Sequence, residues 1–494
     1  MTMEFKLKHP GCVYIGGEWQ PTDVLEDVIN PADESLLGRA PVGSAAQVEA
    51  AIASARHAFD SGDWPRLPVA QRQTVLNRFL DAIEARKDEL VRLIVAEAGS
   101  TQMLAGFLQY GIPMKHARRT VDIASRPALT SLPVELTPNA QGTTTLGTGV
   151  VSREPVGVVA AISPYNFPFF LNIGKVIPAL AVGCTVVLKP SPYTPFEALI
   201  LGEIADEVGL PRGVLSIVTG DVEAGKLLTT DPRVDLVHFT GSDKVGAMIQ
   251  AQGAPTLKRI VMELGGKSAL IVRPDADLQG AAMAGLGGFT VHCGQGCALT
   301  TRHIVHNSVR PQFVSMLKGM MEHIKIGNPA DPTVSYGPLI REVARKRTED
   351  YVAIAQDEGA TLISGGKRPD GLDKGFYFQP TLFDNVRNDS RLAQEEVFGP
   401  IGAVIGYDDD EEAIAMANAS DFGLSGAIWS ADAGKAFDMA LRIRTGGVSI
   451  NGGAGTMQSD APFGGIKRSG YGREYGEDGL NEFTYQKVIS FSAK

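Results

Sequence analysis

"GVVAAISPYNFPFFLNIGKVIPALAVGCTVVLKP", residues 157–190, sets two short apolar runs on either side of a segment of helical length. The runs "GVVAAI" and "TVVLKP" are rich in residues that favour strands, and a strand, a helix and a second strand in this order are typical of a βαβ unit. The same rhythm continues to residue 272 through "VLSIV", "VDLVHF" and "SALIV". The sequence therefore predicts an α/β fold with a parallel sheet covered by helices, and ligands are expected in the loops that leave the C-terminal ends of the strands.

The segments outside this core carry further structural signals. Residues 44–59 predict a helix that opens with a capping box of Ser44 and Gln47, and an apolar stripe predicts a second helix between residues 70 and 98. The polar stretch 135–155 carries β-branched residues but little core material. It predicts a projecting hairpin whose edge seeks a partner.

Composition and charge exclude several classes of protein. The chain has 494 residues, of which 44% are apolar, and its formal net charge is −10. This length predicts two or three domains. The negative charge repels phosphate backbones and anionic lipid, so neither a nucleic acid nor a membrane is expected as a partner. The longest apolar run, 176–188, is too short to span a bilayer, and the first residues lack the apolar segment of a signal peptide.

The chain has only four cysteines, and two of them lie in "CGQGCALTTR", residues 293–302. Four are too few to crosslink a chain of this length, which favours free thiols in a reducing compartment, and we expect a cytoplasmic location. Cys297 stands between Gly296 and Ala298, whose small size lets a carbonyl group approach the sulfur and the neighbouring backbone N–H groups. A nucleophilic thiolate needs this access, but a cysteine between small residues is more often structural. This stretch alone leaves both interpretations open.

A metal site is the third interpretation of this stretch. Its candidate ligands are Cys293 and Cys297 together with His292, His303 or His306. No second Cys/His pair completes a tetrahedral set at a recognisable spacing, so no metal is expected. A disulfide between the two cysteines is equally unsupported in a reducing compartment.

Three further positions carry groups suited to chemistry. Glu263 precedes the run "SALIV" among mostly apolar residues. Burying a carboxylate there is costly unless it is paired or functional, so Glu263 is either a candidate base or a paired, structural glutamate. Asn166 follows a predicted strand and can donate a hydrogen bond to an oxyanion or form an Asx turn. Gly241 and Ser242 open a predicted helix and can present N–H groups to a pyrophosphate, although GxGxxG is absent.

Taken together, these stretches resemble the aldehyde dehydrogenase superfamily in their order and spacing. The resemblance runs from about residue 14 to about residue 483, and it is carried by "SPYNFPF", "LKPSPYTP", "FTGSDKVG", "MELGGKSALIV", "GQGCALTTR", "EEVFGP" and "PFGGIKRSGYGRE". It implies a Rossmann-like cofactor domain, an α/β catalytic domain and a small β-hairpin element for oligomerisation. We place the NAD(P)-binding domain at residues 1–128 and 149–264, the catalytic domain at 265–463, and the oligomerisation element at 129–148 and 480–494. A homodimer or homotetramer is expected.

The resemblance also implies the roles of individual residues. Cys297 is the expected nucleophile toward a small-molecule aldehyde, Asn166 and the Cys297 backbone N–H the oxyanion donors, and Glu263 the base that activates water against the thioester. The expected cofactor contacts are Ser163, Pro164, Lys189, Ser191, Gly220, Gly225, Phe239, Gly241, Ser242, Leu264, Glu396 and Phe398.

Two departures from the family pattern bear on specificity. Pro192 stands where many NAD-preferring members have a glutamate that binds the adenosine ribose, so we expect NAD as the cofactor with room for NADP. Gly174 stands where several members have a bulky aromatic residue, and Val291 is smaller than the Phe often found there, which predicts a wide funnel. The expected substrate is a bulky apolar or aromatic aldehyde. The residues expected to line its funnel are Phe167, Phe169, Phe170, Leu171, Gly174 and Val291.

Two other enzyme classes remain as alternatives at this point. A thiol amidohydrolase or nitrilase would combine Cys297 and Glu263 with a lysine such as Lys175 or Lys267 and would use no nicotinamide. A CoA-acylating aldehyde dehydrogenase is nearer, but such enzymes tend to lack the glutamate that activates water, so Glu263 favours hydrolysis.

Overall fold

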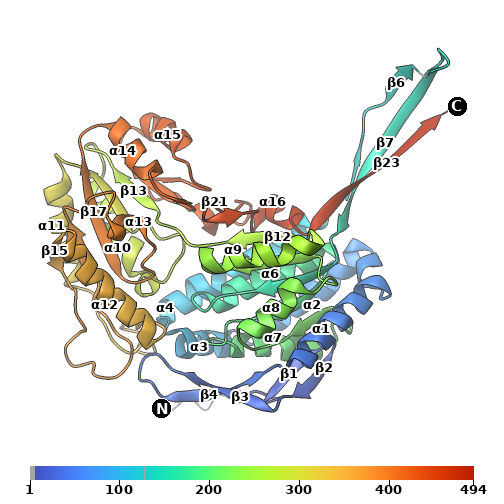
Figure 1. Ribbon diagram of the computed structural model, residues 1–494, viewed down its shortest axis with the longest axis horizontal. Coiled ribbons are helices and arrows are strands. Elements are labelled where there is room, and N and C mark those ends of the chain that lie inside the picture. The colour runs from blue at the N-terminus through green and yellow to red at the C-terminus, as the bar shows by residue number, and fades with distance from the viewer. Residues whose placement is uncertain (1–5, 127, 139, 494) are drawn as a thin grey trace.

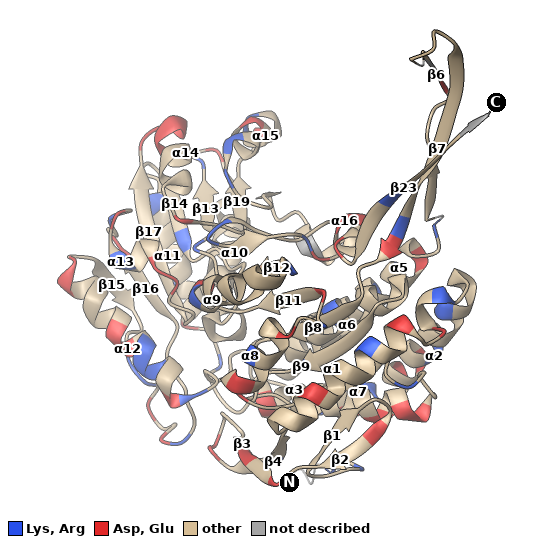
Figure 2. Cartoon of the chain, turned by 45° about the vertical axis from the view of Figure 1, so that its right-hand side comes forward, with Lys and Arg blue, Asp and Glu red and all other residues tan. Residues whose placement is uncertain are grey.

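The structure, a computed structural model, describes residues 6–126, 128–138 and 140–493. Two sheets covered by helices form two lobes, and a long arm projects from one of them (Figure 1). Lys and Arg residues are interspersed with Asp and Glu residues along the chain in both lobes (Figure 2). Within the described residues, no helix is long and apolar enough to cross a membrane.

The first sheet has eight strands in the order β2-β1-β10-β9-β8-β11-β12-β22. Its strands are β1 (Cys12–Ile15), β2 (Glu18–Pro21), β8 (Val158–Ile162), β9 (Thr185–Lys189), β10 (Leu215–Ile217), β11 (Leu236–Thr240), β12 (Arg259–Glu263) and β22 (Gly470–Tyr471). The five strands from β10 to β12 run parallel, and β8, β9, β10 and β11 are buried along their whole length. The parallel sheet that the sequence predicts is therefore confirmed.

Helices cover both faces of this sheet. On one face, α6 and α7 pack against the strands, and α2, α3 and α5 lie behind them. On the other face, α1, α8 and α9 pack against the strands. The bounds of these helices are α1 (Ala45–Asp60), α2 (Val69–Ala85), α3 (Lys87–Ala98), α5 (Ile112–Ile123), α6 (Pro168–Val182), α7 (Phe196–Glu207), α8 (Val222–Thr230) and α9 (Asp243–Gly253). The capping box of Ser44 and Gln47 is present at the start of α1. The single helix expected over residues 70–98 is instead α2 and α3, because Arg86 between them leaves the helical conformation.

The second sheet has seven strands in the order β15-β16-β17-β14-β13-β19-β20. They are β13 (Ala269–Val272), β14 (Arg302–His306), β15 (Thr361–Ser364), β16 (Thr381–Asp384), β17 (Ile401–Tyr407), β19 (Gly426–Trp429) and β20 (Ser449–Ile450). The run "SALIV", which continues the strand rhythm of the first sheet in the sequence, thus opens the second sheet as β13. Residues 264–268 cross from one sheet to the other. The domain bounds given above stay a prediction.

The second sheet is also covered on both faces. Helices α10 (Leu278–Thr290) and α11 (Arg310–Met321) share one core with it. On the other face lie α12 (Glu342–Asp357), α14 (Asp410–Asn418) and α15 (Ala433–Arg442).

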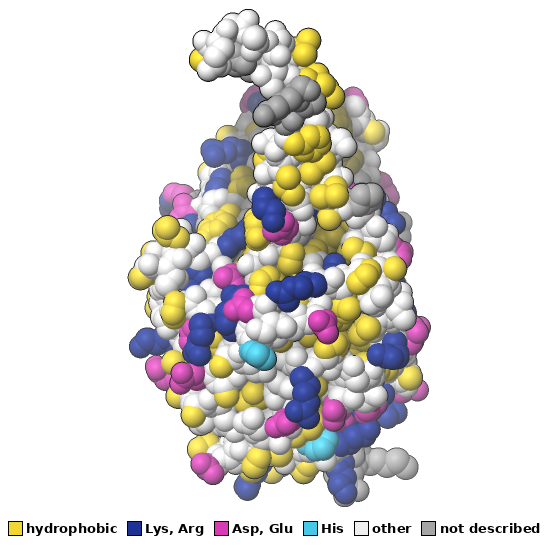
Figure 3. Space-filling view, turned by 90° about the vertical axis from the view of Figure 1, so that its right-hand side faces the viewer, with side chains coloured by type: hydrophobic (Ala, Val, Ile, Leu, Met, Phe, Trp, Pro, Cys, Tyr) yellow, Lys and Arg dark blue, Asp and Glu magenta, His cyan; other side chains and the backbone are white. Residues whose placement is uncertain are grey.

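The arm consists of β5 (Leu129–Ser131), β6 (Glu135–Pro138), β7 (Thr144–Pro155) and β23 (Thr484–Ala493). Strands β6 and β7 pair antiparallel, which confirms the hairpin predicted over 135–155, and β23 pairs with β7 along its whole length. Figure 3 shows hydrophobic side chains gathered along this arm. Those that are exposed include Leu136 at 70%, Val488 at 63% and Phe491 at 58%.

Candidate active site

The candidate catalytic residues lie where the two sheets approach each other. Asn166 follows β8, and Glu263 is the last residue of β12. Because β8 and β12 run in the same direction within one sheet, their C-terminal ends share one edge. Cys297 comes from the loop between the short helix η4 (Val291–Gly294) and β14 of the second sheet.

The Cys297 loop packs directly against this edge. The Asn166 Nδ2 donates a hydrogen bond to the Gln295 carbonyl at 2.9 Å. A Cβ atom placed on Gly266 would lie 2.5 Å from the Cys297 carbonyl oxygen, so only glycine allows this approach. Cys297 is partly exposed, whereas Asn166 is buried. The loop that carries Cys297 therefore contacts the Asn166 amide and Gly266 at this sheet edge.

Cys293 has a different environment from Cys297. It is 1% exposed, belongs to the apolar core of the second lobe, and its thiol donates to the Tyr336 hydroxyl at 3.0 Å. His292 and Cys293 adopt left-handed backbone conformations, with φ of 48° and 55°. Such strain in non-glycine residues clusters at functional sites. All four cysteines are free thiols, and among the described residues no group of three His, Cys, Asp or Glu is placed to hold a metal.

Glu263 is a buried carboxyl without a hydrogen-bonding side chain. It is 1% exposed, and neither carboxyl oxygen has a partner that meets hydrogen-bond geometry within the described chain. Burial raises the pKa of Glu263 well above its usual range, and the negative charge of Glu474 raises it further, although Lys175 opposes this. The raised pKa favours uptake of a proton by this carboxyl, as a general base requires.

A buried charge cluster lies beside Glu263, and the sequence did not indicate it. Lys175 Nζ donates to Glu474 Oε1 at 2.7 Å and to Thr240 Oγ1 at 2.6 Å, and His238 Nε2 lies 2.9 Å from the same Glu474 oxygen. The side chains of Lys175, His238 and Glu474 are at most 1% exposed. Burial opposes ionisation of Glu474, but Lys175 and His238 together lower its pKa. The ammonium of Lys175 is therefore committed to Glu474, which removes its availability for a lysine-assisted amidohydrolase.

The Cys297 thiol is uncharged in this environment. Burial raises its pKa, and the carboxylates of Glu263, Glu396 and Glu474 raise it further. A nucleophilic thiolate must therefore form as its proton leaves, and Glu263, the first of the carboxyls that act on the thiol, is the candidate to receive that proton.

The expected cofactor contacts at the first sheet lie around the same edge. Lys189 ends β9 and is 6% exposed, and its ammonium makes one hydrogen bond, to the Pro190 carbonyl at 3.5 Å. Burial lowers the pKa of Lys189 to about 8. A Cβ on Gly225 would lie 3.8 Å from Lys189 Cε, so α8 approaches this side chain closely. A buried ammonium with a single long hydrogen bond needs another acceptor.

The turn between β11 and α9 presents a helix N-terminus at this edge. Ser242 caps α9 by accepting a hydrogen bond from Val245 N at 3.4 Å. Gly241 leaves room for the Phe239 ring, which would lie 2.3 Å from an added Cβ, and Leu264 packs against Gly246 of α9 in the same way, at 2.8 Å. The remaining expected contacts lie in the loops after β8, β9 and β10: Ser163 and Pro164, Ser191, and Gly220, which has a φ of 142°.

Glu396 and Phe398 lie in the connection between β16 and β17 and contact residues that leave the first sheet. Glu396 Oε1 accepts a hydrogen bond from Gly266 N at 2.9 Å, and burial raises the Glu396 pKa to about 7. Phe398 has a left-handed backbone, with φ of 57°, and its ring meets Tyr165 edge-on at 6.1 Å. Both residues thus lie at the corner where the second lobe meets residues 265–266.

Comparison with known proteins agrees with this geometry. The model of the aldehyde dehydrogenase family matches residues 19–489. A 3-succinoylsemialdehyde-pyridine dehydrogenase from a Pseudomonas species is 38% identical over 96% of this chain and 97% of its own.

The chain belongs to the aldehyde dehydrogenase family. It is an NAD(P)-dependent aldehyde dehydrogenase. A Mycobacterium tuberculosis aldehyde dehydrogenase complexed with NAD+ is 40% identical, with a TM-score of 0.91 over 97% of this chain and 98% of that one. A mutant of aldehyde dehydrogenase C from Pseudomonas syringae, complexed with NAD+ and octanal, is 35% identical, with a TM-score of 0.92 over 99% and 98%.

The expected substrate wall of this aldehyde dehydrogenase is aromatic. The Phe167 ring meets the rings of Phe170 at 6.5 Å and His292 at 5.4 Å, both edge-on. Phe167, Phe170, Leu171, Gly174 and Val291 are all partly exposed, whereas Phe169 is buried and stacks on Tyr110. Phe169 therefore belongs to the core of the first lobe and not to the wall.

The expectation that Gly174 widens the funnel is wrong. A Cβ on Gly174 would lie 3.0 Å from the Tyr475 hydroxyl and 3.2 Å from its Cε1. The space that a side chain at 174 would fill is thus occupied by a tyrosine from the C-terminal part of the chain.

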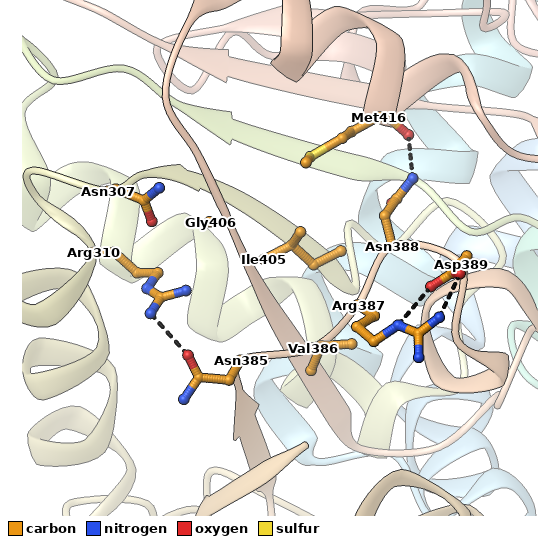
Figure 4. Close-up of a pocket in the computed structure, with 10 residues that line it drawn as sticks. All are labelled: Asn307, Arg310, Asn385, Val386, Arg387, Asn388, Asp389, Ile405, Gly406 and Met416. Atoms are coloured by element: carbon orange, nitrogen blue, oxygen red, sulfur yellow. Dashed lines mark hydrogen bonds and ion pairs between the residues drawn. The ribbon is translucent and has the colours of Figure 1, made fainter. Parts of the chain in front are cut away.

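A separate depression of about 550 Å³ lies in the second lobe of the enzyme (Figure 4). It is lined by residues such as Asn307, which follows β14, while Cys297 precedes β14 at its other end. Arg310 and Arg387 of this depression are bonded to Asn385 and Asp389. The polar side chains that line this depression make hydrogen bonds to neighbouring groups, and none of its lining residues is a nucleophile.

Proposed function

We propose that this enzyme oxidises an aldehyde to the carboxylic acid through a thioester on Cys297 that Glu263 hydrolyses. The observation that carries this proposal is that the partly exposed Cys297 stands on a loop that the Asn166 amide contacts, at the sheet edge where the buried Glu263 carboxyl has no hydrogen-bonding side chain and acts on the thiol.

In the first step, Cys297 Sγ adds to the aldehyde carbon as the thiol proton passes to Glu263. The second N–H of the Asn166 amide, together with the Cys297 backbone N–H, stabilises the resulting oxyanion. A bound nicotinamide would supply the acceptor for the hydride of the thiohemiacetal carbon. Glu263 then returns the thiol proton to solvent. Water attacks the thioester carbon, one of its protons passes to Glu263, and the carbon–sulfur bond breaks to release the acid and the Cys297 thiolate, which takes the proton back from Glu263.

The residues at the strand ends fit a nicotinamide dinucleotide. The buried ammonium of Lys189 needs an acceptor, which ribose hydroxyls supply, and the capped N-terminus of α9 suits a pyrophosphate. NAD is the proposed cofactor, since two structural relatives are complexed with NAD+. Pro192 carries no carboxylate that would repel the 2′-phosphate of NADP, so we expect NADP to be accepted as well. The variant Pro192→Glu should lower kcat/KM for NADP far more than for NAD.

The proposed substrate is a bulky apolar or aromatic aldehyde. Support comes from the Phe167, Phe170 and His292 rings near Cys297 and from two relatives, one named for a pyridine semialdehyde and one complexed with octanal. Turnover of acetaldehyde comparable to that of octanal or benzaldehyde would refute this substrate class.

The test of the reaction is an aldehyde panel assayed for NADH absorbance and for free acid, without CoA. The wild type should form one acid for each NADH, and Cys297→Ala should form neither. A strict requirement for CoA would favour the acylating alternative, and amide or nitrile hydrolysis without a nicotinamide would favour the amidohydrolase.

The arm supports a proposal about assembly. Exposed apolar side chains on paired strands, among them Leu136, Val488 and Phe491, favour contact with a second copy of the chain, as a homodimer or homotetramer. Light scattering that finds only monomers at micromolar concentration would contradict this. The free thiols fit the expected cytoplasmic location.

A further inference from the structure

Tyr475 is a strained, buried tyrosine that packs beside Phe170 and Gly174 of the expected substrate wall. It follows Glu474 and precedes α16 (Gly476–Asn481), and its backbone has φ of 62° and ψ of 166°, a region that is essentially restricted to glycine. Reciprocal backbone hydrogen bonds between Glu474 and Phe463, at 2.7 and 2.8 Å, hold the chain in this conformation. Strain of this kind persists only where the surrounding structure imposes it, and it is most frequent at functional sites.

The tyrosine ring is fixed by packing against two other rings. It lies 4.6 Å from His116 and meets Phe170 edge-on at 5.7 Å. The residue is 7% exposed, and its hydroxyl makes no hydrogen bond of good geometry among the described residues, although the adjacent Glu474 carboxylate is close enough to interact with it. A buried hydroxyl that is rigidly held and lacks such a bond is costly unless a ligand or water completes its bonding.

The hydroxyl lies beside the residues of the expected substrate wall. A Cβ on Gly174, a partly exposed residue of α6, would lie 3.0 Å from it, so the missing side chain of Gly174 gives it room. Burial raises the pKa of the Tyr475 hydroxyl well above the usual range, and the titratable groups of Glu474, Glu263 and Cys297 raise it further. Tyr475 therefore keeps its proton and acts as a neutral hydrogen-bonding group.

We propose that the Tyr475 hydroxyl holds the water that opens the thioester, as a second contact beside Glu263. This inference rests on the hydrolytic function proposed above. One water proton passes to Glu263 as the oxygen attacks the carbonyl carbon and the bond to Cys297 Sγ breaks. The hydroxyl of Tyr475 neither gains nor loses a proton; it orients the water so that a lone pair faces the acyl group.

The test uses the full-length enzyme and 4-nitrophenyl acetate without any nicotinamide, which isolates acyl transfer to Cys297 and hydrolysis. Acylation breaks the ester bond and releases nitrophenolate in a burst, and the steady rate then reports attack by water. Tyr475→Phe should keep a burst of one nitrophenolate per Cys297, and its steady rate should fall about tenfold, as expected for the loss of one hydrogen bond. Mass spectrometry of quenched samples should show more acyl-enzyme than in the wild type.

Tyr407→Phe is the matched control. Tyr407 is also buried, and its hydroxyl donates to the Val272 carbonyl at 3.2 Å in the second sheet, far from the thioester. Its loss should leave the burst and the steady rate unchanged. A second test displaces the hydroxyl without removing it: Gly174→Ala should slow hydrolysis in the wild type and should add nothing in the Tyr475→Phe background.

Two results would overturn this inference alone: a steady rate for Tyr475→Phe within twofold of the wild type, or a burst and a steady rate that fall in equal proportion. A wild type with neither a burst nor an acyl mass on Cys297 would instead overturn the proposed function, and this inference with it.

Discussion

Two clusters of buried carboxyl groups in the first lobe offset the cost of buried negative charge in different ways. Glu263 and Glu474 lie beside Lys175, which forms a 2.7 Å ion pair with Glu474. Glu97 and Glu197 are both fully buried, and neither forms an ion pair with a Lys or Arg of the described chain. Instead, the backbone N–H of Phe196 donates to Glu97 at 2.8 Å, and the Asn172 amide donates to Glu197 at 2.8 Å.

The second cluster favours a bound proton. Burial raises the pKa of Glu97 well above its usual range, the neighbouring charge of Glu197 raises it further, and burial raises the pKa of Glu197 to about 7. In the first cluster the cation of Lys175 keeps Glu474 ionised, and the pKa of Glu263 is raised by burial and by that charge. An unpaired carboxyl next to a fixed ion pair can act as a base. In a pair of carboxyls that binds one proton, neither group is available as a base.

The largest expected effect comes from replacing one carboxyl in each cluster. Glu263→Gln removes the proposed base and should lower the rate of thioester hydrolysis about 10³-fold, since general base catalysis contributes roughly 10²–10⁴-fold. Acylation by 4-nitrophenyl acetate should still be measurable, and the acyl-enzyme should accumulate. Glu97→Gln, the matched control, should keep the wild-type rate. Equal losses in the two variants would remove the distinction between the clusters.

The next effect concerns stability. Lys175→Met leaves Glu474 buried without its cation, and removing one partner of a buried ion pair costs about 3–5 kcal/mol. Urea denaturation at pH 7 should show this loss. Lys346→Met, which breaks an exposed pair with Asp350 at 3.2 Å, is the control and should leave the midpoint unchanged.

The double variant Lys175→Met/Glu474→Gln sharpens this test. It removes both charges and should recover most of the stability that Lys175→Met loses. If the double variant is less stable than the single one, the ammonium of Lys175 does not act through Glu474.

The sequence predicted the features that depend on local patterns. The strand runs of residues 157–240 and the capping box at Ser44 follow from spacing within a few residues, and both are present. Asn166 was expected after a strand and follows β8, whereas the strand that ends at Glu263, β12, was not predicted. Cys297 was identified by its motif, and its partial exposure beside Asn166 agrees with the role that remains proposed.

The residues that the sequence did not indicate are brought in by distant contacts. Lys175 and Glu474 are 299 positions apart, and their contact depends on β22, which joins the first sheet beside β12 through backbone pairing. No pattern around residue 474 signals that arrangement. Gly174 was misjudged for the same reason, because the side chain that fills its space comes from residue 475. His238 alone left a local signal, as a polar residue inside the apolar run "VDLVHF".

The smallest expected effect is a change in how stability depends on pH. The pKa values of Glu97 and Glu197 are raised in the folded state, so the folded chain binds a proton that the unfolded chain releases. Their contribution to stability is therefore fully present below the ordinary carboxyl pKa and is lost as the pH rises through the folded pKa. Glu97→Gln keeps a donor toward Glu197 without a titrating proton, and between pH 5 and pH 8 it should lose about 1 kcal/mol less stability than the wild type. Urea denaturation at the two pH values measures this difference, with Glu89→Gln, a partly exposed residue on α3, as the reference. A wild type and a Glu97→Gln variant with parallel stability profiles would mean that Glu97 carries no proton in the folded state, and the contrast with Glu263 would then rest on Lys175 alone.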